Sequence, residues 1–292
     1  MITTLNKNKV LVYLVIPLTI TTVFAAMYFS HILVLQRLIS PKLPPLLINS
    51  WREFGLLENT QNIFLLVMVI VLLFGIWRAT EKLQRAGFVF VTLFTIFVFL
   101  EEVDYFTHWY SYFTAEEPIH WFKPLPLQDL FALAEENENT VNFNIHNQGE
   151  LLKVFKFLSD FTIVCLFVLL PLIAPYINNR YVRYAAPERY AILTCVMMFV
   201  MSKLIHQIGK LDKFLFKAIH IVNVFDKHYF NNSIFEGKEP AIELGSISSN
   251  LSEFRELNVY YLFMVYLIIL VFYRSLEKNQ SANTQVENPE NS

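Results

Sequence analysis

Hydrophobic residues along this chain are gathered in long blocks that polar segments separate, and this pattern predicts membrane-spanning helices. A helix needs roughly 20 apolar residues to cross a hydrocarbon core about 30 Å thick, and the blocks reach about that length. The predicted spans cover about residues 10–34, 62–79, 87–106, 152–177, 187–206 and 258–274. The sequence therefore predicts an all-α integral membrane bundle of about six transmembrane helices. We expect residues 1–276 to form this domain, with long extracytoplasmic loops.

Basic residues concentrate on one side of this predicted topology. With six spans, the two termini and the short connections 78–86 and 178–188 share a side. The basic residues there are Lys7, Lys9, Arg78, Lys82, Arg85, Arg180, Arg183, Arg274 and Lys278. Because short cytoplasmic loops carry an excess of Lys and Arg, both termini are predicted to be cytoplasmic. The long connections 35–61, 107–151 and 207–257 then face outward.

The amino-acid composition also indicates an integral membrane protein, and the net charge argues against a nucleic-acid partner. Hydrophobic residues make up 55% and charged residues 16% of the chain, against about 25% charged in soluble domains. The formal net charge of −2 gives no case for nucleic acid. Residues 277–292 have almost no apolar side chain and are predicted to be a disordered cytoplasmic tail. The Phe-, Lys- and Asn-rich composition favours a bacterial protein, and hence the inner membrane.

Two carboxylates end the third predicted span and are the first candidate site. The uncharged run Gly87–Leu100 has 14 residues, which is about 21 Å of helix and too short to cross the bilayer. Glu101, Glu102 and Asp104 are therefore expected at the edge of the hydrocarbon, where ionisable groups are costly and usually functional. Helical spacing places Glu101, Asp104 and His108 on one face. The alternative is that these carboxylates only reach the interface or cap the following loop.

A second polar group opens the fourth span. Asn144, His146 and Asn147 stand where the chain re-enters the membrane, and Asp160 lies deeper in the same span. Lys156, one helical turn before Asp160, is its simplest predicted partner. A Lys–Asp pair that only holds helices together explains Asp160 as well as a chemical role does.

Ionisable groups of four spans are predicted to converge in one outer layer. His206 ends the fifth span, and Glu253 and Glu256 precede the last one. The candidate catalytic residues are Glu101, Glu102, Asp104 and His146. The candidate ligands of a divalent metal such as zinc are Glu101, Asp104, His108, His146 and His206. The predicted structural polar residues are Asn144, Asn147, Asp160, Lys156, Glu253 and Glu256.

The Glu101-Glu102 pair and the Asn144-Ile145-His146-Asn147 motif resemble an uncharacterised family of bacterial multi-pass membrane proteins. In that family a Glu-Glu pair ends a membrane helix, an aromatic loop follows, and Asn-x-His-Asn opens the next helix. Where the family has Ser-Trp-Gly-Gln after the Glu pair, this chain has Val103-Asp104-Tyr105-Phe106. The resemblance implies a site at these positions and brings no assigned reaction.

Three functions are compatible with these residues. The first is a membrane-embedded, metal-assisted hydrolase or transferase that acts on a lipid or lipid-linked substrate. The second is a non-catalytic assembly partner or scaffold for another membrane protein. The third is an ion-coupled transporter, which is disfavoured because the carboxylates gather at one face and not near the midplane.

Overall fold

The computed structural model describes residues 6–30, 32, 35, 38–39, 55–103, 106, 149–216 and 251–274, without the side chains of 149–153, 155–156, 213 and 216. In this part of the chain all regular structure is helical, and six helices are long and apolar enough to cross a membrane. The predicted all-α membrane bundle is thereby confirmed. The spans are Lys7–Tyr28, Leu56–Arg78, Lys82–Glu102, Phe157–Tyr176, Ala191–Asp212 and Glu253–Tyr273.

The helical elements of the described chain are α1 (Lys7–Val10), η1 (Leu11–Val15), α2 (Ile16–Tyr28), α4 (Leu56–Arg78), α5 (Lys82–Glu102), α8 (Gly149–Ile163), η5 (Val164–Leu169), α9 (Leu170–Ile173), η6 (Ala174–Tyr176), α10 (Arg180–Ala185), α11 (Ala191–Phe216), α14 (Glu253–Ile268) and η8 (Ile269–Tyr273). The π-helical turns η1 and η5 precede Pro17 and Pro171, which cannot donate a backbone hydrogen bond. Pro17 therefore gives no bond to the carbonyl of Tyr13, which accepts one from Thr194 Oγ1 of α11.

Three span boundaries differ from the sequence prediction, and the two that belong to the third span matter for the carboxylates. The third span begins at Lys82 and not near position 87, because long basic side chains can extend to the interface while their backbone stays helical. Its 21 residues cover about 31 Å, and the helix ends at Glu102 and not near 106. The first span ends at Tyr28, before the predicted position 34. Glu101 and Glu102 thus occupy the last turn of a helix of full membrane length.

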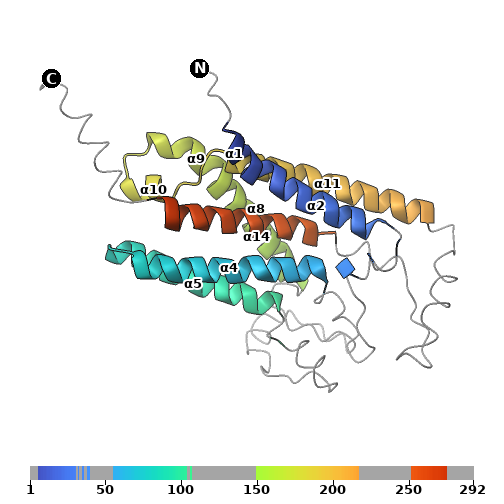
Figure 1. Cartoon of the computed structure of the whole chain (residues 1–292), viewed down its shortest axis with the longest axis horizontal. Coiled ribbons are helices and arrows are strands. Elements are labelled where there is room, and N and C mark those ends of the chain that lie inside the picture. Colours follow the sequence, from blue (N-terminus) through green and yellow to red (C-terminus); the bar gives the residue numbers. More distant parts are fainter. Residues whose placement is uncertain are drawn as a thin grey trace, which may run out of the picture.

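The helix α14 lies at the centre of the bundle (Figure 1). The antiparallel pair α4 and α5 packs on one side of it, and α2 and α11 pack on the other. The ring of Phe167 in η5 packs edge-on against Phe263 of α14, with centroids 4.8 Å apart, so the fourth span contacts α14 as well. Half of the α14 span is buried, against 17% of the α5 span. The bundle therefore has an axial helix, α14, and a peripheral one, α5.

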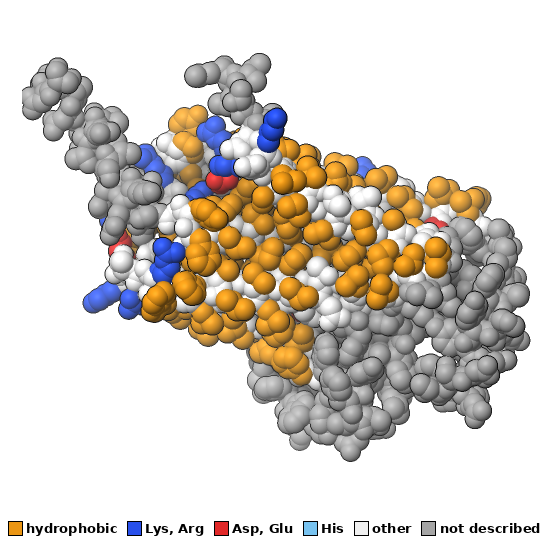
Figure 2. Space-filling view, viewed as in Figure 1, with side chains coloured by type: hydrophobic (Ala, Val, Ile, Leu, Met, Phe, Trp, Pro, Cys, Tyr) orange, Lys and Arg blue, Asp and Glu red, His pale blue; other side chains and the backbone are white. Residues whose placement is uncertain are grey.

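Large apolar side chains cover the flank of the bundle (Figure 2). Phe90 of α5 is 71% exposed and Ile70 of α4 is 63% exposed, as expected of side chains that face lipid. Basic side chains gather at one end of this flank (Figure 2). We call it the Arg-rich end, and its basic residues are Lys7, Lys9, Arg78, Lys82, Arg85, Arg180, Arg183, Arg189 and Arg274.

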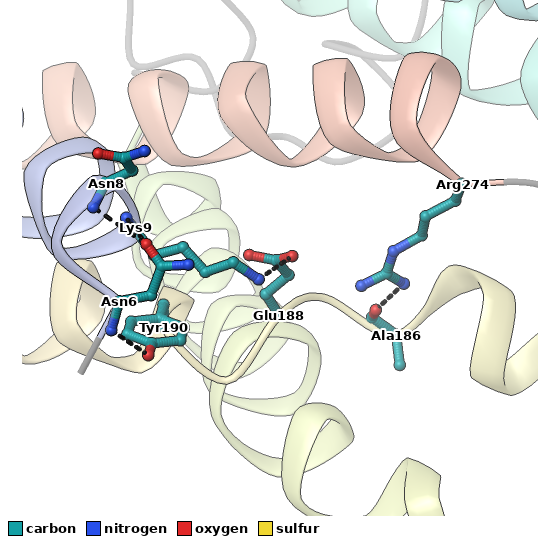
Figure 3. Close-up of polar contacts among 7 residues, drawn as sticks. All are labelled: Asn6, Asn8, Lys9, Ala186, Glu188, Tyr190 and Arg274. Atoms are coloured by element: carbon teal, nitrogen blue, oxygen red, sulfur yellow. Dashed lines mark hydrogen bonds and ion pairs between the residues drawn. The ribbon is translucent and has the colours of Figure 1, made fainter. Parts of the chain in front are cut away.

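Both described chain ends are fastened at the Arg-rich end to the connection between α10 and α11 (Figure 3). Lys9 Nζ forms an ion pair of 2.8 Å with Glu188 Oε1. The backbone N–H of Asn6 donates to the hydroxyl of Tyr190 at 3.0 Å. Arg274 Nη1 donates to backbone carbonyls of the same region. These contacts fix the entry of the first span and the exit of the last one.

Gly75 of α4 lies in close contact with side chains of α5 and η8, and the first prediction concerns this contact. A Cβ atom there would lie 3.0 Å from Val271 Cγ2 and 3.3 Å from Phe88 Cδ1, whereas one at Gly87 would meet nothing within 4 Å. We expect Gly75→Leu to lower the free energy of unfolding by roughly 1–3 kcal/mol through overpacking. Gly87→Leu should leave it nearly unchanged. Thermal unfolding in detergent measures both, and equal losses in the two variants would contradict the packing described here.

Candidate functional site

Glu101 and Glu102 are held at the end of α5 in different surroundings. Glu101 is only 3% exposed, although it lies in the last turn of the most lipid-exposed span. Glu102 is partly exposed, and its Oε1 accepts a hydrogen bond of 2.6 Å from the hydroxyl of Tyr260 in α14. The short O–H···O distance is typical of a carboxylate acceptor. The axial helix therefore orients one carboxylate of the predicted pair.

Two further carboxylates lie near the same phenol. Glu253 and Glu256 occupy the first turn of α14. They precede Tyr260 by seven and four residues, so helical spacing places them on the same face of α14 as this tyrosine. We call this region, with Glu101, Glu102, Tyr260, Glu253 and Glu256, the carboxylate end. Acidic side chains of α5 and α14 lie at this end, while the convergence of ionisable groups from four spans stays a prediction.

The neighbouring helix α4 contributes two buried amides to the carboxylate end. Gln61 Nε2 donates to the backbone carbonyl of Glu253 at 2.9 Å and lies 3.4 Å from its Oε2. Gly75 of α4 contacts Phe88 of α5, and the two helices are antiparallel. Asn62 precedes Gly75 by as many residues as Glu101 follows Phe88, so Asn62 and Glu101 lie at similar heights. The amides of α4 and the carboxylates of α5 are thus at the same level.

The amide oxygens of these two residues have no hydrogen-bond donor among the described residues. Gln61 is fully buried and Asn62 is 8% exposed, and neither Oε1 of Gln61 nor Oδ1 of Asn62 is satisfied. Exchanging the O and N atoms of Gln61 would bring its oxygen against two acceptors of Glu253, so the orientation follows from chemistry. Buried unsatisfied acceptors are rare and suit a ligand that carries donors.

Asp160 forms an ion pair across the bundle. Arg255 Nη1 lies 3.0 Å from Asp160 Oδ1 and 3.2 Å from Oδ2, and only the contact to Oδ2 has the angle of a hydrogen bond. The sequence predicted Lys156, whose side chain lies outside the described part, as the simplest partner. The structure gives Asp160 a partner on a different helix, because α14 lies beside the fourth span. This ion pair favours the structural reading of Asp160.

Asn258 makes a buried polar contact between α14 and the first span. Its Nδ2 donates to Thr21 Oγ1 at 2.8 Å and to the carbonyl of Phe254 at 2.7 Å. The hydroxyl of Thr21 in turn donates to the carbonyl of Pro17 at 2.8 Å. The same hydroxyl lies 3.1 Å from Asn258 Oδ1, so the amide and the hydroxyl bond only to each other and to backbone carbonyls, which is typical of a helix-packing contact.

Most of the predicted metal ligands lie outside the described residues. These are Asp104, His108 and His146, and the predicted structural residues Asn144 and Asn147 lie outside them too. His206 is described and exposed, and its Nδ1 lies 2.8 Å from the carbonyl of Ser202, one helical turn earlier. Within the described chain no group of three or more His, Cys, Asp or Glu side chains is placed to hold a metal ion. Glu101 offers a suitable oxygen donor, and the predicted zinc centre stays a prediction.

Tyr260, Gln61, Asn62 and Thr21 were not selected from the sequence. Asn62 and Gln61 begin an apolar block, where polar residues are commonly read as its boundary. Tyr260 stands in an aromatic stretch, Tyr260-Tyr261, that is typical of a membrane interface. The sequence does indicate a helix–helix contact for Asn258, because an amide inside a membrane span usually forms a hydrogen bond to another helix.

No family model, curated protein or solved structure matches this chain. The roles of the side chains at the carboxylate end therefore rest on their geometry, and the resemblance described above stays a prediction.

The Tyr260–Glu102 contact generates the second prediction. Tyr260→Phe removes the donor from a half-buried carboxylate, and we expect the free energy of unfolding to fall by about 1–2 kcal/mol. Glu102→Gln keeps an oxygen acceptor and should cost less. Tyr273→Phe, at an 80% exposed position of the same span, is the matched control. Unfolding in mixed micelles measures all three, and a Tyr260→Phe variant as stable as Tyr273→Phe would refute the contact.

The partner of Asp160 is the subject of the third prediction. A double-mutant cycle between Asp160→Asn and Arg255→Gln should give a coupling of about 1 kcal/mol, reduced by partial solvent exposure. The same cycle between Asp160→Asn and Lys156→Gln should give a coupling near zero. The reverse order of the two couplings would restore Lys156 as the partner.

Proposed function

We propose that this protein is a membrane-embedded enzyme that uses Glu101 and Glu102 as acid–base groups in hydrolysis or group transfer on a lipid or lipid-linked substrate. The observation that carries the proposal is the pairing of a 3% exposed carboxyl, Glu101, with a carboxylate that Tyr260 orients. Two adjacent carboxyl groups in different environments can divide the acid and base roles. One accepts a proton from the attacking nucleophile, and the other donates a proton to the leaving group.

The position of α5 supports a lipid substrate. Only 17% of the α5 span is buried, and exposed side chains such as Phe90, Leu93 and Phe94 lead along it toward the carboxylate pair. A lipid diffusing in the bilayer can therefore bring its headgroup to Glu101 and Glu102 without crossing the bundle. The unsatisfied amide oxygens of Gln61 and Asn62 suit hydroxyl or ammonium donors of such a headgroup. A transporter would need these groups along a central path, which α14 fills.

A metal is compatible with this proposal without being required by it. If zinc binds, Glu101 is the described residue suited to hold it, with Asp104, His108, His146 and His206 as the predicted further ligands. A bound divalent metal would polarise the substrate and lower the pKa of a bound water. Tyr260 orients Glu102 in either case.

We further infer that the protein lies in a bacterial inner membrane with its Arg-rich end in the cytoplasm. The excess of Lys and Arg at that end supports this orientation under the positive-inside rule. The carboxylate end then faces outward, and the substrate would be taken from the outer leaflet of that membrane.

The second candidate function is a non-catalytic assembly partner. The observation that favours it is the set of polar contacts between α14 and other spans, Arg255 with Asp160 and Asn258 with Thr21, which join the helices to one another without a ligand. Under this reading the carboxylate end only specifies helix packing, and a second membrane protein would bind to it.

The fourth prediction tests the proposed activity directly. Purified protein in nanodiscs of bacterial lipid should convert a lipid to products that mass spectrometry detects, and Glu101→Gln or Glu102→Gln should lower the rate by about 100-fold or more. Glu81→Gln, at the opposite end of α5, removes the same charge and should retain the activity. Elemental analysis of the same samples reports bound metal. Conversion that survives in the Glu101→Gln and Glu102→Gln variants would reject the assignment, and no conversion by folded wild-type protein would favour the assembly partner.

A further inference from the structure

Two arginines at the Arg-rich end project from neighbouring helices. Arg78 is the last residue of α4, and its guanidinium lies 5.9 Å from the centroid of the Phe272 ring in η8. Arg274 follows η8 directly, and its Nη1 donates to the carbonyls of Tyr184 and Ala186. These bonds use one nitrogen of the Arg274 guanidinium, so its other N–H groups are available for an anion.

Tyr184 links the two arginines in space. Its hydroxyl accepts a hydrogen bond of 2.7 Å from Gln84 Nε2, and Tyr184 itself is a buried residue of α10. Burial raises the pKa of this hydroxyl, and the charges of Arg274 and Arg78 act in the opposite direction. Arg78 lies over the ring of Phe272, and Arg274 follows that residue by two positions, so both guanidinium groups lie at the same end of α4 and η8.

Neither arginine has a carboxylate partner among the described residues. The described acidic side chains at this end are engaged elsewhere, Glu188 with Lys9 at 2.8 Å and Glu81 with Arg180 at 3.0 Å. Lys82, four residues after Arg78, has no ion pair in the described part either. Within the described residues, the positive charge of this corner is thus not neutralised.

Aromatic side chains surround the arginines at the depth where lipid headgroups lie. Trp77 is 74% exposed and Tyr273 is 80% exposed. The ring of Phe74 lies 5.3 Å from that of Trp77 and 5.7 Å from that of Phe272. Exposed Trp and Tyr residues at the end of a span are typical of the membrane interface. An apolar chain can therefore contact these rings while its charged head reaches the arginines.

We propose that Arg78 and Arg274, flanked by Trp77 and Phe272, bind the phosphate headgroup of an anionic phospholipid in the leaflet that the Arg-rich end faces. The planar guanidinium groups match the geometry of phosphate oxygens. The acyl chains lie along Phe74 and Trp77 of α4. Basic pockets between transmembrane helices are suited to such headgroups. The proposal does not depend on the acid–base function of the carboxylate end.

The fifth prediction is tested by native mass spectrometry of the full chain titrated with phosphatidylglycerol or phosphatidylcholine. We expect wild-type protein to bind phosphatidylglycerol at least about tenfold more tightly than phosphatidylcholine. Arg78→Gln should lose most of this preference, and Arg78→Lys, which keeps the charge without the fork of donors, should be intermediate. Arg274 is left unchanged because it also holds backbone carbonyls of Tyr184 and Ala186.

Arg189→Gln is the matched control, because it removes one positive charge from the same end at the connection that carries Glu188 and Tyr190. It should retain the preference for phosphatidylglycerol. Equal losses of the preference in Arg189→Gln and Arg78→Gln would show that only net charge matters and would contradict the proposed lipid-binding site. Displacement of the lipid by millimolar inorganic phosphate would assign the site to a soluble anion. The unfolding temperature of each variant, measured in phosphatidylcholine, shows whether a loss of the preference for phosphatidylglycerol is caused by misfolding. If Arg78→Gln does not fold, Arg78→Lys provides the test.

Discussion

Polar groups at membrane depth must find partners inside the protein, because the hydrocarbon offers none. In this bundle the axial helix α14 supplies those partners to most of the other spans. Tyr260 reaches α5, Arg255 reaches the fourth span, and Asn258 reaches the first. Because these contacts point in different directions from one helix, the rotation of α14 about its own axis is fixed. The positions of the surrounding helices follow from that rotation and from the close contact at Gly75.

The two carboxylates of α5 have an environment that neither a buried core nor an open surface would give. Their helix lies at the periphery, so lipid can approach it, yet Glu101 is buried and Glu102 is bonded to the axial helix. A peripheral carboxylate oriented by a central tyrosine is an arrangement suited to chemistry on a membrane-borne headgroup. The unsatisfied oxygens of Gln61 and Asn62 at a similar level add acceptors to the same region.

Hydrophobic block length was sufficient to predict the fold class, because only a continuous helix satisfies its own backbone in lipid. The boundary of the third span was less predictable, since Lys82 and Arg85 belong to the helix although they are charged. The rotation of each helix about its own axis could not be predicted from the sequence, and the partner of Asp160 is an example. The sequence predicts Lys156, one turn away in the same helix, as the partner of Asp160. The structure shows an ion pair with Arg255, which lies about 95 residues further along the chain. The sequence indicates Glu101 and Glu102 as candidates because charges beside a long apolar run are unusual, and it does not indicate Tyr260 because tyrosine is common at the end of a span.

The place of α14 in the chain has a consequence for biosynthesis. The ribosome makes this helix after the other five spans, so these enter the bilayer before the partners of Glu102, Asp160 and Thr21 exist. Until then Glu102, Asp160 and Thr21 lack the partners that α14 supplies. Insertion of the last helix brings Tyr260, Arg255 and Asn258 to these groups in a single step. The polar contacts between α14 and the earlier spans are therefore completed only when the final span enters the membrane.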